Sequence, residues 1–187
     1  MPPYQNWIFL VVKDAALRAR IGRIYRDAGE RIRTGYSARL GDRPTHLSQD
    51  KFQRIMNSAA YLREHLGEAP VLLFACLRAR KADEAVGGAG GSVPAMTQRT
   101  ASASIYPAVQ NTILACRALG LGTVLTTLHT FAEDKIASLL HLPAGVTTYA
   151  LLPIGFPQDG YKHGPVPRLP LEQVTFVHTM DHPWGKK

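Results

Sequence analysis

The sequence is short of acidic residues, of cysteine and of long apolar runs. It has 14 Asp and Glu against 22 Lys and Arg in 187 residues, a formal net charge of +8. The longest uninterrupted apolar run, residues 71–77, is far too short to cross a bilayer. Two cysteines cannot build a disulfide framework, and neither has a zinc-binding spacing. Both lie among apolar residues, which predicts buried free thiols in a cytoplasmic protein.

Several catalytic signatures are missing as well. The seven histidines form no HxxxH or HExxH pair, so we predict no metal site. Residues 87–91 are rich in glycine but lack the Lys-Ser/Thr of a phosphate loop. Gly120-Leu121-Gly122 lacks a third glycine and ends a helical pattern, which indicates a helix C-cap and not a dinucleotide fold. No G-x-S-x-G elbow is present, which argues against a serine hydrolase.

The positive charge is concentrated near the N-terminus. Residues 14–35 predict an amphipathic helix with arginines around an apolar stripe, and Asp14 is its expected N-cap. A basic helix can bind nucleic acid phosphates. No zinc finger, helix-turn-helix or aromatic RNA-binding motif accompanies it, so we favour a solvated surface helix and expect no nucleic acid partner. The predicted stripe consists of Leu17, Ile21, Ile24, Ala28 and Ile32.

The remaining chain alternates short apolar runs with helical patterns. Strands are predicted at residues 8–12, 71–77, 149–154 and 174–180, with a Thr-rich, β-prone segment at 123–130. A second helix should begin after Ser48, a central helix should run from about residue 104 to Gly120, and a short one should span 132–140. Without a regular βαβ repeat, this order predicts a single α+β domain over residues 1–187. The second helix has its apolar stripe at Phe52, Ile55, Met56, Ala59 and Leu62.

Two connecting segments are candidates for function. Residues 78–103 form a long Gly-rich loop, which we interpret as a mobile lid. Thr126, Thr127, His129 and Thr130 cluster before the short helix, whose first backbone N–H groups are free to bind an anion or an electron-rich ring. The residues alone do not identify that ligand.

Four stretches, taken in order, resemble the FMN-dependent nitroreductase family. Gln5-Asn6-Trp7 with the strand behind it is similar to the end of the family's P-S-x-x-N-x-Q-P-W segment, and residues 68–76 are similar to its second core strand. Residues 104–130 resemble the central helix and the loop that contacts the flavin. Residues 151–157 with Arg168-Leu169-Pro170-Leu171-Glu172 resemble the P-x-G-x-P turn and the R-x-P-L-E stretch.

The resemblance implies an α+β fold with a mixed or antiparallel central sheet flanked by helices, in a homodimer with FMN at the interface. It also implies that a backbone N–H donates to flavin N5, at Thr130 with His129 beside it, and that Arg168 holds the FMN phosphate. No side chain is assigned as a catalytic acid. The implied FMN contacts are Gln5, Ser104, Ile105, Thr126, Thr127, Leu128, His129, Thr130 and Arg168, of which Ser104 and Ile105 would come from the partner subunit.

The chain departs from the family pattern at its start. The family opens with a helix bearing R-R-S-I-R, whose arginines hold the FMN phosphate, and Met1-Pro2-Pro3 stands where part of the flavin segment would be. We therefore expect a chain shortened at its N-terminus relative to the family, with weakened FMN binding.

The function that the resemblance implies is transfer of hydride from NAD(P)H through flavin N5 to a nitroaromatic, a quinone or a similar small acceptor, by a ping-pong scheme. Two alternatives remain open at this point. One is a flavin-binding or flavin-storing protein without turnover, and the other is a flavin-fragmenting relative.

Overall fold

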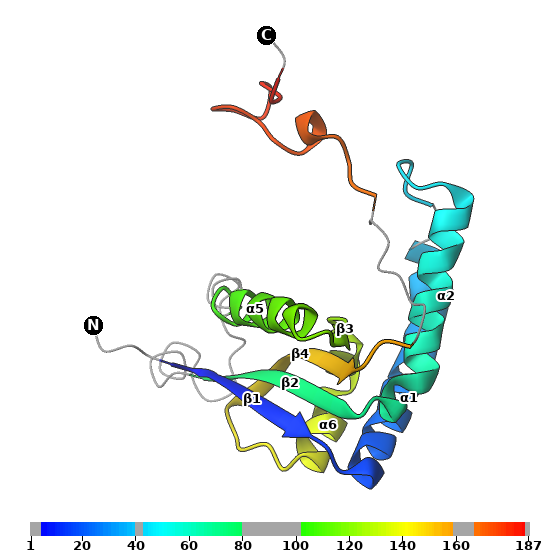
Figure 1. Ribbon diagram of the computed structural model, residues 1–187, viewed down its shortest axis with the longest axis vertical. Helices are drawn as coiled ribbons and strands as arrows, with labels where there is room; N and C mark the ends of the chain where they lie inside the picture. Colours follow the sequence, from blue (N-terminus) through cyan, green and yellow to red (C-terminus); the bar gives the residue numbers. More distant parts are fainter. Residues whose placement is uncertain (1–4, 40–42, 80–101, 159–166, 186–187) are drawn as a thin grey trace.

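The structure, a computed structural model, describes residues 5–39, 43–79, 102–158 and 167–185. At its centre lies an antiparallel sheet of four strands in the order β1-β2-β4-β3. The strands are β1 (Trp7–Val12), β2 (Val71–Arg78), β3 (Gly122–Thr123) and β4 (Val146–Gly155). Figure 1 shows helices on both faces of this sheet. The predicted α+β fold is confirmed, and among the described strands all pairings are antiparallel.

Strand β2 is apolar from Val71 to Leu77 because helices cover both of its faces. Leu72, Phe74 and Cys76 point into one core cluster, while the alternate residues of β2 point into a second cluster on the opposite face. Helix α5 (Ile105–Ala118) covers the second cluster with Ile105 and Val109. The two predicted free thiols, at Cys76 and Cys116, are confirmed as buried and unbridged.

Helices α1 (Ala15–Arg39) and α6 (Glu133–Leu139) cover the other face of the sheet. The Asp14 carboxylate accepts a hydrogen bond from the Leu17 amide at 2.7 Å, which confirms the predicted cap. The predicted apolar stripe of α1 is also confirmed, since Ile21 and Ala28 are fully buried.

A close backbone contact fixes α1 against the turn that follows α2 (Gln49–His65). A methyl group at Gly67 would lie 2.9 Å from the Arg18 carbonyl oxygen, and one at Gly22 would lie 3.0 Å from the Gly67 Cα. The Arg18 guanidinium donates to the carbonyls of Gly67, at 3.3 Å, and Ala69. Glycine is therefore required at positions 22 and 67, because a side chain at either would collide with backbone atoms.

Substitution of Gly67 by alanine should destabilise the protein by about 1–3 kcal/mol, because backbone atoms must move to make room. The free energy of unfolding in urea measures this effect. Gly122→Ala is the matched control, because its new methyl group would meet atoms no closer than 3.5 Å. Equal stability of the two variants would contradict the packing argument.

Helix α2 forms where the sequence predicts it, but much of its apolar stripe stays exposed. The Ser48 hydroxyl accepts from the Lys51 amide at 3.4 Å, as expected for the cap. No residue of α2 is buried, and Ile55 and Met56 are 44% and 39% exposed. Leu62, near the C-terminal end of α2, packs against the core cluster on the α1 side of the sheet, whereas the N-terminal part of α2 extends past the sheet (Figure 1).

The C-terminal segment 167–185 stands apart from the sheet (Figure 1). The strand predicted at residues 174–180 is wrong, since the structure has a short 3-10 helix, Leu171–Gln173, and one isolated bridge between Phe176 and Pro183. The segment pairs with itself, as in the bond from the Val177 amide to the His182 carbonyl at 2.8 Å. Apolar alternation makes a strand only where another strand lies alongside.

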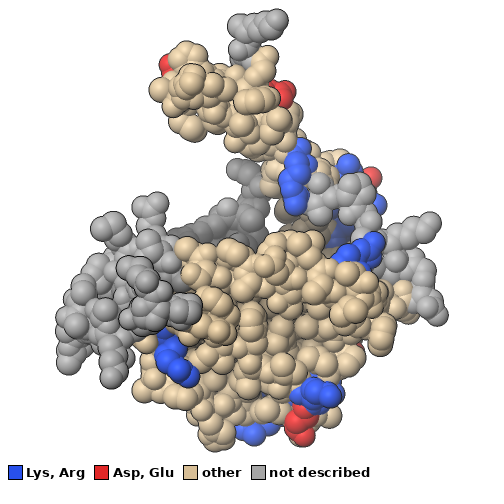
Figure 2. Space-filling model, turned by 60° about the vertical axis from the view of Figure 1, so that its left-hand side comes forward, with Lys and Arg blue, Asp and Glu red and all other residues tan. Residues whose placement is uncertain are grey.

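Part of the arginine excess on α1 has structural partners. Arg26 pairs with the Glu64 carboxylate of α2 at 2.9 Å and also donates to the Glu64 carbonyl. On the face drawn in Figure 2, Lys and Arg lie in separate groups and do not merge into one field. This distribution fits the predicted solvated helix better than a nucleic-acid-binding face.

Two further expectations concern the predicted lid and membrane-spanning segments. Most of the predicted lid, residues 80–101, lies outside the described residues. Among the residues that the structure describes, no helix is both long enough and apolar enough to cross a membrane.

Candidate functional site

The loop of residues 126–130, hereafter the 126–130 loop, connects the short strand β3 to α6 and is held firmly against the sheet. Thr126 exchanges backbone hydrogen bonds with Leu151 of β4 at 3.0 and 2.9 Å. Its hydroxyl shares a hydrogen bond of 2.7 Å with the Tyr25 hydroxyl of α1. These contacts tie the start of the loop to two elements that are distant in sequence.

Beyond Thr126 the chain turns into a 3-10 helix, Leu128–Ala132, which sorts its side chains between core and surface. Thr127 and Thr130 are exposed, Leu128 is half-buried, and His129 is fully buried. The exposed hydroxyls therefore belong to Thr127 and Thr130, on the side of the loop that faces away from the core.

The backbone donors of the loop differ in availability. The Thr130 amide donates to the Thr127 carbonyl at 3.0 Å, and the Thr130 hydroxyl donates to the same oxygen at 2.8 Å. The Leu128 amide reaches the Thr126 hydroxyl at 3.4 Å. The His129 amide lies in the first turn of the 3-10 helix and has no intrahelical partner. His129 has no exposed surface as a residue, so in this conformation its amide is not reachable from solvent.

The His129 side chain points into the core. Its ring meets the Phe74 ring edge-on, with 5.6 Å between ring centroids, and neither ring nitrogen has a hydrogen-bond partner. Burial lowers the pKa of His129 from 6.5 to about 4, so the imidazole is neutral at pH 7. This side chain faces away from the solvent side of the loop, where Thr127 and Thr130 lie.

The other residues implied by the resemblance are scattered. Gln5 is exposed just before β1, and Ser104 is exposed at the N-terminus of α5. Ile105 is fully buried under its own helix, so its side chain is committed to the core of this chain.

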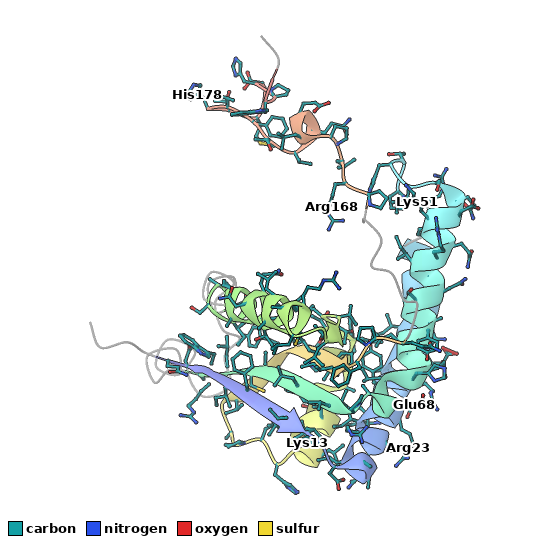
Figure 3. All side chains as sticks on the ribbon, viewed as in Figure 1. Lys13, Arg23, Lys51, Glu68, Arg168 and His178 are labelled. Atoms are coloured by element: carbon teal, nitrogen blue, oxygen red, sulfur yellow. The ribbon has the colours of Figure 1, made fainter. Side chains whose placement is uncertain are left out.

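Arg168 lies far from the 126–130 loop within one chain. Figure 3 shows it on the C-terminal segment, away from the sheet and α5. It is exposed, and its guanidinium donates only to the adjacent Pro167 carbonyl, at 3.4 Å. A single chain therefore assembles the loop but not the loop together with Arg168.

Two residues that the sequence analysis missed organise the loop. Burial raises the pKa of the Tyr25 hydroxyl, although its hydrogen bond to Thr126 acts in the opposite direction. Glu133, the first residue of α6, accepts from the Thr148 amide at 2.9 Å and from its hydroxyl. Tyr25 lies four residues after Ile21 on the apolar stripe, and this spacing was the available signal for it.

Within the described part of the chain, no group of three or more His, Cys, Asp or Glu side chains could hold a metal ion. What the site offers is the exposed threonines Thr127 and Thr130 on a rigid frame. Such groups suit an electron-rich or anionic organic ligand.

Comparison with solved structures shows that other proteins share this fold. A BluB-like flavoprotein from Clostridium difficile 630 superimposes with a TM-score of 0.61 at 22% identity, over 93% of this chain and 80% of that one. Iodotyrosine deiodinase bound to FMN and 3-iodo-L-tyrosine superimposes with a TM-score of 0.59 at 23% identity, over 92% of this chain and 78% of that one. The NADPH:FMN oxidoreductase of Vibrio harveyi complexed with NAD+ gives 0.62 at 16% identity, over 96% of this chain but only 61% of its own.

No curated protein matches the sequence significantly. The sequence profile of the nitroreductase family matches residues 3–156, which include the whole sheet and the 126–130 loop. With this match and the shared fold, the chain belongs to the nitroreductase family.

Proposed function

We propose that this protein is an FMN-dependent oxidoreductase that passes two electrons from NAD(P)H to a nitroaromatic, a quinone or a similar small acceptor. The observation that carries the proposal is the preformed 126–130 loop in a chain of the nitroreductase family. Bound FMN would supply the redox chemistry, since its N5 accepts and passes on hydride. The buried free thiols fit the reducing cytoplasm.

The chain's own groups would bind and orient the flavin. The exposed threonines Thr127 and Thr130 lie on one short loop, and the Tyr25 and Leu151 contacts hold that loop in place. Fixed donors of this kind stabilise negative charge that develops on a ring, because they need no reorganisation when the charge appears. The loop therefore fits an isoalloxazine edge.

The phosphate end of the cofactor requires a second chain. Arg168 is the matching cation, but its own segment carries it away from the loop. The exposed stripe of α2 leaves apolar surface for another copy to cover. We propose a homodimer in which each flavin site takes groups from both subunits.

The test is a titration of the purified protein with FMN, followed by assays of NADH and NADPH oxidation with menadione or nitrofurazone. We expect flavin fluorescence to be quenched on binding and nicotinamide oxidation to depend on the acceptor. Bound FMN without nicotinamide oxidation would indicate storage, and loss of flavin absorbance in air would indicate fragmentation. Failure to bind FMN would contradict the proposal.

The Thr127 hydroxyl should contribute to flavin affinity. Thr127→Val keeps the branched shape but removes the exposed hydroxyl, so we expect the Kd for FMN to rise about fivefold to tenfold. Thr147→Val is the matched control, because Thr147 is exposed on β4 and is outside the loop. Equal affinity of the two variants would place the flavin elsewhere.

A further inference from the structure

A concavity of about 680 Å³ lies between α1 and α6 on the side of the sheet that those helices cover. Its polar lining consists of Arg20 of α1, Asp134, Lys135 and Ser138 of α6, and His141 beyond the end of α6. Ile24 and Leu139 form the apolar part of its lining. The volume lies within the range of small-molecule sites, and the polar lining residues are exposed to solvent.

The cations in this concavity are not used to hold the fold. Arg20 and Lys135 make no hydrogen bond and no ion pair with any described group, whereas Arg18 and Arg26, which are also on α1, bind carbonyls and a carboxylate. Asp134 opposes them with one negative charge. The lining therefore carries an excess of one positive charge.

A second concavity, of about 280 Å³, adjoins the first at His141, which lines both. Arg78 also lines it, but its wall is mostly apolar. Burial is the main cause that raises the pKa of Cys76 to about 11, so this thiol is neutral and adds to the apolar wall. The apolar residues include Ile8, Leu10, Cys76, Leu140, Leu142 and Val146.

His141 is an unusual residue for its backbone position. Its φ is 51°, in the left-handed region that favours glycine. His141 caps the C-terminal end of α6. Its amide donates a hydrogen bond to the Ser138 carbonyl at 3.3 Å, and the Leu142 amide donates one to the Ala137 carbonyl at 2.9 Å. Glycine is the usual residue at this place in such a cap. An imidazole thus stands at the junction of the two concavities where the backbone alone would favour no side chain.

From this arrangement we infer a binding site for an amphipathic anion, a small carboxylate or phosphate ester carried on an apolar chain or ring. The anionic head lies against Arg20, Lys135 and His141, and the apolar body lies past His141 in the second concavity. Charge complementarity selects the head, and the limited volume of about 280 Å³ restricts the length of the body.

Octanoate is the first probe, measured by calorimetry on the full chain at pH 7. Acetate lacks the apolar body and octanol lacks the charge, so each should bind at least about tenfold more weakly. In the series from butanoate to dodecanoate, affinity should rise about threefold to fourfold for each methylene that is buried and then level off when the second concavity is full. Octyl phosphate distinguishes a carboxylate site from a phosphate site by its affinity relative to octanoate.

The substitutions separate binding from folding. Arg20→Ala and Lys135→Ala should each weaken octanoate binding about fivefold to tenfold. Arg23→Ala is the matched control, since Arg23 is exposed on α1, three residues from Arg20, and lines neither concavity (Figure 3). His141→Gly should weaken binding while the melting temperature stays equal or rises, because it relieves the left-handed backbone of a side chain.

A fourth substitution should change octanoate affinity in the opposite direction. Asp134→Asn removes the opposing charge, so octanoate should bind more tightly. Leu142→Trp narrows the second concavity and should abolish the gain with chain length. The proposed site would be overturned if octanol bound with the same affinity as octanoate. It would also be overturned if Arg20→Ala and Lys135→Ala both bound octanoate as tightly as the parent protein.

Discussion

Lowering the pH from 7 to 4 should reduce the free energy of unfolding by about 3 kcal/mol through His129 alone. The imidazole is fully buried against Phe74 and lacks any hydrogen-bond partner, so the folded protein resists its protonation. In the unfolded chain the same group titrates near 6.5, whereas in the folded chain its pKa is about 4. The unfolded state therefore binds the proton more tightly.

The direction of the effect follows from that difference. Between pH 6.5 and about 4 the unfolded chain is protonated and the folded chain is not, so each step toward acid favours unfolding. About 2 kcal/mol should be lost between pH 7 and 5. Below pH 4 both states are protonated and the contribution of this group no longer changes.

Urea unfolding of the His129→Leu variant across this pH range measures the contribution. We expect the variant to lack this part of the acid sensitivity and to be about 1 kcal/mol more stable at pH 7, because two unsatisfied buried nitrogens are removed. His46→Leu is the control, since His46 is exposed. An acid response that is the same in His129→Leu as in the parent would show that the imidazole finds a partner in solution.

Placing a carboxylate on the apolar stripe of α2 should separate the subunits and release the flavin. Ile55 is 44% exposed in the single chain, and burial of a new charge in an apolar interface costs several kcal/mol. For Ile55→Glu we expect a monomer by sedimentation and a Kd for FMN at least about 100-fold higher than in the parent. Circular dichroism should be unchanged, because Ile55 itself is exposed and does not pack against the core of its own chain.

The matched control for this substitution is Asn57→Glu, which adds the same charge to another exposed position of α2. It should remain dimeric and bind FMN normally. If Ile55→Glu stays dimeric, the stripe is not the subunit interface. If it becomes monomeric but keeps its FMN affinity, the flavin site does not need groups from two chains.

Much of the fold follows from local signals. The apolar run of β2 has both faces buried, and Asp14 and Ser48 cap the helices that follow them as expected from their short polar side chains. These features depend on residues within one or two turns of each other. The position of the 126–130 loop also follows, because it is fixed between the end of one predicted helix and the start of the next.

The orientation of side chains within that loop did not follow from the pattern. His129 and Thr130 are adjacent polar residues, yet one is fully buried and the other is exposed. The 3-10 turn and the surrounding elements decide this, through Phe74 of β2 and the Tyr25 contact of α1. Both partners are more than fifty residues away along the chain, so no local period records them.

By itself the sequence determined most of the strands and helices, where the main helices begin, and the resemblance of the chain to nitroreductases, but its predicted strand at residues 174–180 does not form. Only the tertiary structure decided which partner covers each apolar surface. The stripes of α1 and α2 look alike in sequence, but α1 packs on the sheet and α2 extends past it, and the alternation at residues 174–180 lacks a neighbouring strand. Periodicity shows that a surface is apolar, whereas the partner that covers it is set by contacts between distant segments or between chains.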